Sequence, residues 1–249
     1  GSRIRFDVAR EHGANFVTDA ARNLARQRAE HPEPHQTFDH QRFWADLLWS
    51  PSLACNLVGD LAADPAVARR AVRAWWPDVP GDPVDVRISH SPGRFDPAFT
   101  NNLVVFDALI ELDLGDSAGV LAIDVKHHEH AKREIPKPEN RSRYLEVHER
   151  SGVFRPEALV AVDATPLTER WLEHLLLLSM LQHPSGRWAW GRYVVVHSAG
   201  NTDAVESIDT YRSVLADDAT FGSVTLEDLL TIEALPPAAQ DALRRRYVM

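Results

Sequence analysis

The sequence predicts an α/β domain with a central mixed β-sheet flanked by helices. Short runs rich in β-branched and aromatic residues alternate with longer segments of helical periodicity. Residues 104–112 and 120–127 are joined by a segment containing Gly, Asp and Ser, which predicts a hairpin. Residues 191–199 are apolar almost without interruption, which is typical of a buried parallel strand. The two kinds of strand together predict a mixed sheet.

The first third of the chain has the pattern of successive helices. Pro is well tolerated in the first turn of a helix, and Ser50-Pro51 and Asp64-Pro65 are start signals of this kind. Pro breaks a helix at an interior position, so Pro32 is expected to follow the end of an earlier helix. We expect these helices to pack on one side of the sheet. They are predicted at 12–30, at 38–49, from residue 50 onward, and at 64–76.

The remaining segments predict further strands and the helices that cover them. Residues 84–91 alternate in polarity and predict a strand, and 91–102 predict an irregular loop that leads into the hairpin. Residues 169–182 are apolar almost all round, which predicts a helix buried between the sheet and its neighbours. Other helices are predicted at 201–216, 225–235 and 236–247.

Three charged residues interrupt the apolar hairpin. Side chains alternate across a strand, so Asp124 and Lys126 share one face of the second strand. If the strands pair, Asp107 of the first strand can converge with them at one end of the hairpin. Charges within apolar strands are costly to bury unless a metal or a ligand compensates them. The alternative interpretation is that each charge faces solvent at the edge of the sheet.

These residue types suit the hydrolysis of a phosphodiester with the help of a metal ion. Two carboxylates can hold a hard divalent cation such as Mg²⁺ or Mn²⁺, so Asp107 and Asp124 are the candidate metal ligands. The cation lowers the pKa of a bound water and neutralises charge on the phosphate. Lys126 would orient the attacking water or bind the scissile phosphate. Glu129 would assist the metal or the water, unless it is an exposed loop residue.

The motif resembles that of the PD-(D/E)XK, or restriction-endonuclease-like, nuclease superfamily. Phe106-Asp107 stands in place of Pro-Asp, and Asp124-Val125-Lys126 forms the D-x-K half. Segments 51–61, 91–108 and 123–131 and the late helix and strand are similar to a poorly characterised bacterial branch of predicted restriction endonucleases. The similarity covers about residues 45 to 235. In that branch a Glu often precedes the Ser-Pro-Gly-Arg run, where this chain has Ser89-His90, so one metal or base contact is missing.

The resemblance implies a Mg²⁺-dependent endonuclease that acts on DNA, most readily on double-stranded DNA, with a role in restriction or in defence against phage. A homodimer is compatible with this, because many double-strand cutters pair two active sites. Two rival hypotheses remain. The chain can be a non-catalytic member of the fold that binds DNA or protein in a defence system, or a phosphodiesterase that acts on RNA.

Basic residues near the motif are candidates for contacts to the nucleic-acid backbone. A net charge of −9 argues against a protein covered in nucleic-acid-binding surface, but a local basic rim can still hold DNA. Arg94 is the best phosphate ligand of the loop before the hairpin, because a guanidinium pairs with phosphate oxygens bidentately. The alternative is a solvated charged loop. The candidate rim consists of Arg94, Lys132, Arg133, Lys137, Arg141 and Arg143.

Other residues are weaker candidates for metal ligands. His127, His128 and His130 suggest zinc, but adjacent His on a strand face opposite ways and no Cys or second His cluster completes a tetrahedral site. Asn56 and Asp60, one turn apart on an early helix, are weaker candidates for a metal contact than for a polar helix face. A short helix carrying Tyr144 and Glu146 is expected to border the site.

Composition places the chain among globular proteins. At 249 residues, with 44% hydrophobic and 25% charged residues, it is expected to form one domain, with a helical part at 3–76 and an α/β core at 84–235. The single cysteine, Cys55, permits no internal disulfide, which fits a reducing cytoplasm. We find no apolar run long enough to cross a bilayer and no signal peptide, so we expect a cytoplasmic protein without membrane contact. No Gly-rich nucleotide loop is present.

Overall fold

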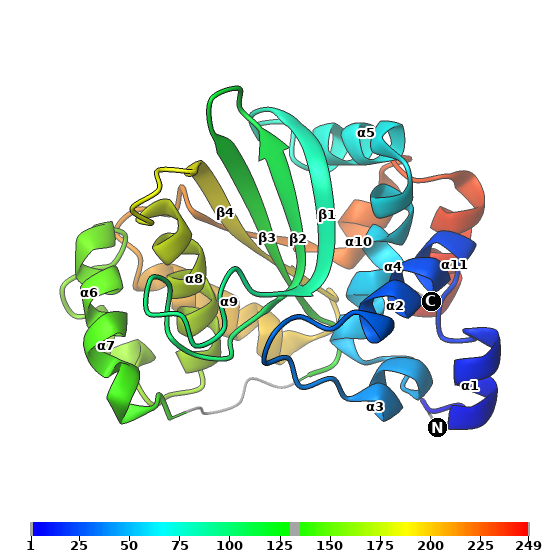
Figure 1. Ribbon diagram of the computed structural model, residues 1–249, viewed down its shortest axis with the longest axis horizontal. Helices are drawn as coiled ribbons and strands as arrows, with labels where there is room; N and C mark the ends of the chain where they lie inside the picture. The colour runs from blue at the N-terminus through cyan, green and yellow to red at the C-terminus, as the bar shows by residue number, and fades with distance from the viewer. Residues whose placement is uncertain (1, 130–134, 249) are drawn as a thin grey trace.

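A five-stranded β-sheet lies between two groups of helices in the computed structural model, which describes residues 2–129 and 135–248 (Figure 1). The strands follow chain order across the sheet. The first three pair antiparallel, and the last two join the third in parallel. The predicted mixed sheet flanked by helices is therefore confirmed. The strands are β1 (Asp82–His90), β2 (Phe106–Asp113), β3 (Ala118–Lys126), β4 (Trp188–His197) and β5 (Phe221–Thr225).

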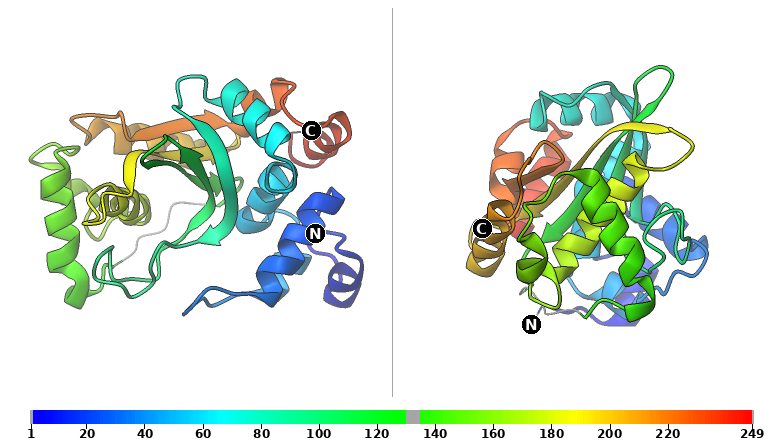
Figure 2. Two further views of the ribbon diagram at one scale, coloured as in Figure 1. Left: turned by 45° about the horizontal axis from the view of Figure 1, so that its top comes forward. Right: turned by 90° about the vertical axis from the view of Figure 1, so that its left-hand side faces the viewer.

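One face of the sheet is covered by the N-terminal helices and the last two helices of the chain (Figure 1 and Figure 2). Ile110 and Ile123 point from the middle of the sheet into this apolar core, where they meet Leu57 of α4 and Leu229 of α10. The helical N-terminal part therefore packs directly on the sheet, on one side as expected. These helices are α1 (Phe6–His12), α2 (Asp19–Glu30), α3 (His40–Ala45), α4 (Ser50–Ala63), α5 (Pro65–Trp75), α10 (Leu226–Thr231) and α11 (Pro237–Tyr247).

The opposite face is covered by α8, which packs on β4, and by the helices around it. Trp171 and Leu175 of α8 are fully buried and meet Val120 and Tyr193 of the sheet, as the apolar sequence of this helix predicts. Asp124 and Lys126 follow Val120 at even spacing and therefore project toward this face. The covering elements are η1 (Pro138–Asn140), α6 (Arg141–Ser151), α7 (Ala158–Val162), α8 (Thr168–Leu181) and α9 (Thr202–Ser213).

Several elements differ from the sequence-based expectation. The helix predicted at 12–30 begins only at Asp19, as α2, and a separate helix that was not predicted, α1, ends before it where Gly13 adopts a left-handed conformation with φ 61°. Thr18 then caps α2 by accepting a hydrogen bond from the amide of Ala21. The helix predicted at 38–49 is limited to α3. Strand β5 was not predicted, since it has only five residues and Gly222 at its second position.

No helix within the described residues is long and apolar enough to span a membrane. The prediction that residues 1–249 form one domain stays a prediction.

Candidate functional site

The two aspartates of the hairpin lie opposite each other where β2 begins and β3 ends. Ala108 pairs with Ile123 in the antiparallel register, so the next residues outward, Asp107 and Asp124, face one another. The Asp107 carboxylate accepts a hydrogen bond from the backbone amide of Val125 at 2.9 Å. Asp107 thus uses its side chain to hold the end of β3, and this contact fixes the carboxylate beside Asp124.

Lys126 completes the group from the same face of β3. Its Nζ lies 3.0 Å from Oδ1 of Asp124 and 3.1 Å from Oε1 of Glu169. The ammonium is therefore paired within the site and not with a remote acid. The structure brings together all three residues of the predicted motif, although they come from strands that are separate in the chain.

The acids around Lys126 outnumber the positive charge that this lysine provides. Burial raises the pKa of Asp107 well above its usual value, and the neighbouring charge of Asp124 raises it further. Burial acts to lower the pKa of Lys126, but the charges of Asp124, Glu173 and Glu169 outweigh it and raise the pKa well above the ordinary lysine value. Lys126 is therefore an ammonium at neutral pH, a hydrogen-bond donor and not a base.

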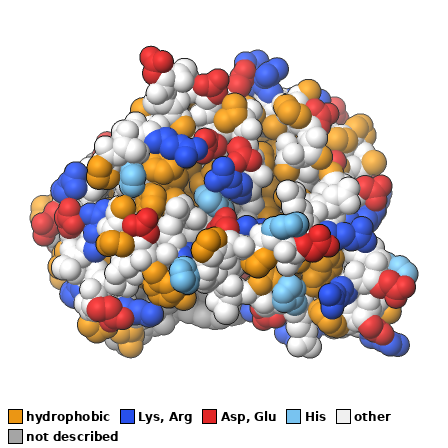
Figure 3. Space-filling view, in the orientation of Figure 1, with side chains coloured by type: hydrophobic (Ala, Val, Ile, Leu, Met, Phe, Trp, Pro, Cys, Tyr) orange, Lys and Arg blue, Asp and Glu red, His pale blue; other side chains and the backbone are white. Residues whose placement is uncertain are grey.

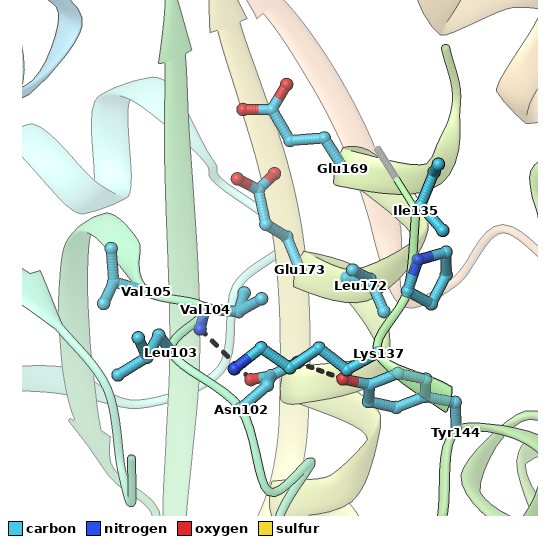
Figure 4. Close-up of a pocket in the computed structure, with 11 residues that line it drawn as sticks. Asn102, Leu103, Val104, Val105, Ile135, Lys137, Tyr144, Glu169, Leu172 and Glu173 are labelled. Atoms are coloured by element: carbon cyan, nitrogen blue, oxygen red, sulfur yellow. Dashed lines mark hydrogen bonds between the residues drawn. The ribbon is translucent and has the colours of Figure 1, made fainter. Parts of the chain in front are cut away.

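Two further acids, which the sequence pattern alone did not indicate, reach the site from α8. Glu169 and Glu173 lie one turn apart, and Figure 4 shows both carboxylates projecting from the same side of the helix. Glu173 is buried and accepts a hydrogen bond of 2.5 Å from the hydroxyl of Tyr193, which also lies 3.5 Å from Oδ2 of Asp124. Burial first, and then the charge of Asp124, raises the pKa of Glu173 well above its usual value. Two acids spaced by four in a largely apolar helix were the available signal.

Two hollows give access to the acids. The larger, about 350 Å³, runs between residues 102–105 and the Glu169 and Glu173 side of α8, and Tyr144 closes one end of it (Figure 4). The smaller, about 160 Å³, reaches Asp107 from the side of the N-terminal helices. Charged and histidine side chains border the middle of this face in the space-filling view (Figure 3). Tyr144 therefore borders the site as predicted.

The donor set fits a hard divalent cation. The paired carboxylates of Asp107 and Asp124 provide the oxygen ligands that Mg²⁺ or Mn²⁺ takes, and a cation between them would relieve the repulsion that raises the Asp107 pKa. Within residues 2–129 and 135–248 no three His, Cys, Asp or Glu side chains are grouped as a ready-made metal site. Two protein carboxylates with waters in the remaining positions is a common arrangement for Mg²⁺.

Glu129 is held in a different role from the one expected. Its Oε1 accepts a hydrogen bond from the amide of Ser50 at 3.0 Å, and its Oε2 accepts from the amides of His127 and His128. Although burial acts to raise the pKa of Glu129, the hydrogen bond from Ser50 lowers it. The carboxylate thus binds the start of α4 to the end of β3. A direct catalytic role for Glu129 stays a prediction, and these contacts would have to be broken for it.

Arg94 is likewise engaged inside the protein. Its side chain is only 3% exposed, with one guanidinium nitrogen paired with Glu33 and another donating to the carbonyl of Ser89 at 3.0 Å. Arg94 lines the smaller hollow, but it does not present a free guanidinium to the surface. A phosphate contact by Arg94 stays a prediction that requires part of this pairing to be exchanged.

The other predicted basic residues differ from one another in their contacts and exposure. Arg143 donates to the carbonyls of Phe99 and Ala98, which fixes the loop before β2, and Arg141 pairs with Asp163. Lys137 is exposed at the rim of the larger hollow. Lys132 and Arg133 lie outside the described residues.

The weaker candidates have structural partners. Asn56 accepts a hydrogen bond from the amide of Val17 and donates to the Tyr247 hydroxyl, and Asp60 accepts one from Thr18. Both therefore connect α4 to neighbouring segments. Glu146 is paired with Arg143 on the outside of α6. His130 of the suggested zinc group lies outside the described residues.

Comparison with known proteins gives one match. The sequence matches a family model described as the PD-(D/E)XK nuclease superfamily over residues 1–249. No curated protein and no solved structure matches significantly.

Proposed function

The chain belongs to the PD-(D/E)XK nuclease superfamily, and on this basis we propose that it hydrolyses phosphodiester bonds of DNA with the help of Mg²⁺ or Mn²⁺. One observation supports the proposal above all. Asp124 is buried and Asp107 is partly buried, and the two form a mutually repelling carboxylate pair with a charged lysine beside it. Such a pair is costly unless a cation joins it, and Mg²⁺ or Mn²⁺ would lower the pKa of a bound water and neutralise charge on the phosphate.

The residues of this chain have separate tasks in the proposed reaction. Asp107 and Asp124 would hold the cation, and the hydrogen bond from the amide of Val125 fixes the orientation of the Asp107 carboxylate. Lys126 has three N–H donors, of which Asp124 and Glu169 occupy two. The third can donate to the attacking water or to a phosphate oxygen, where the positive charge stabilises the negative charge that develops.

We propose that the substrate is double-stranded DNA and that the protein acts in restriction or in defence against phage. The net charge of −9 requires that the contacting surface be local. All three lysines of the chain occur between residues 126 and 137 of the sequence, and the exposed Lys137 at the rim of the larger hollow supports a local basic contact.

A plasmid-nicking assay tests the proposal. The purified protein is incubated with supercoiled DNA in Mg²⁺, in Mn²⁺ and in chelator, and with RNA of similar length. We expect cation-dependent nicking of DNA that is lost in Asp107→Asn and Lys126→Ala. Asp116→Asn is the matched control, because this exposed aspartate lies at the other end of the same hairpin. Cleavage that persists unchanged in both site variants would identify a contaminant, and preferred cleavage of RNA would replace DNA as the substrate.

A non-catalytic binding module is the second candidate. Ser89 stands where related sequences often carry a Glu, and Glu129 is bound to backbone amides. Both observations reduce the acids available to the site. DNA binding that is measurable by mobility shift, without cleavage in either cation, would support this candidate.

A further inference from the structure

Glu169 reaches the proposed catalytic lysine from α8, and the two side chains line a third, small hollow together. Nζ of Lys126 lies almost midway between two carboxylate oxygens, 3.0 Å from Asp124 and 3.1 Å from Glu169. Asp124 belongs to the same strand as Lys126, whereas Glu169 comes from α8, more than forty residues later. The lysine is thus held between the sheet and the helix that covers it.

The position of Glu169 is well defined by its own helix. The hydroxyl of Thr168 donates to the carbonyl of Val162 at 2.7 Å and accepts from the amide of Thr165 at 2.9 Å, which fixes the first turn of α8. Thr168 is fully buried, and the next side chain, Glu169, is one third exposed at the rim of the hollow. An acid in the first turn also interacts favourably with the helix dipole.

A lysine side chain needs such a second anchor. Its flexible four-carbon stem has many rotamers, so a single partner leaves the ammonium free to swing around that partner. In the proposed reaction Asp124 would bind the cation as well as the ammonium of Lys126. Glu169 would not bind the cation, so it can hold the ammonium throughout the reaction.

Glu173 does not share this role. Its carboxylate is bound to the Tyr193 hydroxyl at 2.5 Å and is buried against β4, and among the described residues it makes no hydrogen bond to Lys126. The two acids of α8 therefore have different partners. Glu173 is hydrogen-bonded to Tyr193 behind Asp124, and Glu169 is hydrogen-bonded to Lys126 at the rim.

We infer that Glu169 is a positioning residue that, together with Asp124, fixes the ammonium of Lys126 so that its third N–H points to the bound phosphate or water. This inference rests on the proposed nuclease function. It differs from a role as cation ligand, because Glu169 acts through the lysine.

The kinetic test compares Glu169→Gln and Glu169→Asp with the control Glu206→Gln, an exposed acid on the neighbouring helix α9. Glu169→Gln is expected to lower kcat by about 10–100-fold, the usual effect of losing a group that orients a reacting one, with Glu169→Asp intermediate. The Mg²⁺ concentration for half-maximal activity should stay unchanged.

A spectroscopic arm does not depend on activity. The chain has three lysines, so a ¹⁵N–¹H spectrum of the side-chain ammonium groups is simple, and Lys126→Arg assigns the signal of interest. A doubly paired ammonium exchanges slowly and should be visible in the wild-type protein. The signal should be lost or strongly broadened in Glu169→Gln and kept in Glu206→Gln, with circular dichroism confirming that each variant is folded.

The outcomes separate this inference from the proposed function. Full activity in Glu169→Gln or a raised Mg²⁺ requirement would each overturn the positioning role. If the wild-type protein cleaves nothing, the nuclease proposal fails, while the ammonium signal still shows whether Glu169 fixes Lys126. An unchanged signal in Glu169→Gln would overturn the inference in that case too.

Discussion

Two largely buried carboxylates, Glu33 and Asp107, lie in opposite electrostatic surroundings. Glu33 is paired with two arginines, Arg28 at 2.8 Å and Arg94, and its carboxylate lies 2.6 Å from His90. Although burial acts to raise the pKa of Glu33, the contact with His90 and the other partners lower it to about 2. Burial and the charge of Asp124 raise the pKa of Asp107 instead.

The number of positive partners explains the difference. The Glu33 cluster has two arginines and a histidine for one carboxylate, and its contacts join the segment after α2 to the end of β1. Around Lys126 a single ammonium faces four acids: Asp107, Asp124, Glu169 and Glu173. A neutralised cluster stabilises the fold, whereas an acid cluster that lacks positive charge is suited to take up a cation.

The largest expected effect is on activity and tests the acid cluster. Asp124→Asn should lower cleavage by about 10²–10³-fold, the scale of losing one charge-stabilising group, while the protein stays folded. Initial rates of plasmid nicking, corrected for the folded fraction by circular dichroism, measure this. A loss of less than tenfold would remove Asp124 from the reaction.

The next effect is on stability and tests the Glu33 cluster. Glu33→Gln should lower the free energy of unfolding by about 3 kcal/mol, near the lower end for removing one partner of a buried charge pair, since the side chain is 18% exposed. Cleavage per folded molecule should fall much less than in Asp124→Asn. Urea unfolding at pH 7 gives the free energy, and a change within 0.5 kcal/mol, roughly that of a neutral surface substitution, would contradict the structural role.

The pH dependence of this effect has a definite sign. A carboxyl whose pKa is lower in the folded than in the unfolded state stabilises the fold above its unfolded pKa, and this contribution disappears as the pH falls through the folded value. The stability difference between wild type and Glu33→Gln should therefore shrink as the pH falls from about 5 toward 2. A difference that stays constant over this range would show that the ionised Glu33 is not what stabilises the cluster.

Cation binding should stabilise the protein through the acid cluster. At a concentration 100 times its dissociation constant, Mn²⁺ or Mg²⁺ should add about 2.7 kcal/mol to the free energy of unfolding. Thermal unfolding with and without the cation measures the shift, which should be absent in Asp107→Asn. An equal shift in that variant would place the cation elsewhere in the molecule.

The smallest expected effect is an increase in the free energy of unfolding. Asp107→Asn removes a repelled acid and should raise stability at pH 7 by about 1 kcal/mol, the scale of a typical single substitution. Because the folded pKa of Asp107 is raised, the wild-type protein should lose stability as the pH rises through that pKa, and the variant should lose less. Unfolding at pH 5 and pH 8 tests the sign, and a destabilised variant at pH 8 would contradict it.

Local sequence was enough to predict four of the five strands and the three residues of the motif. Side-chain alternation is fixed by the geometry of a strand, so Asp124 and Lys126 had to share a face, and the short turn placed Asp107 next to them. The apolar run of α8 likewise required a buried helix. These features depend on neighbours in the chain, and the structure agrees with them.

Only the tertiary structure decided which distant groups join the site. Glu169 and Glu173 reach Lys126 and Tyr193 because α8 packs across β4, and Glu33 meets Arg94 across sixty-one positions of the chain. Glu129 is close to the motif in sequence, but its carboxylate accepts a hydrogen bond from the start of α4. Periodicity encodes the direction of a side chain from its own strand or helix, but the partner it meets depends on how separate elements pack.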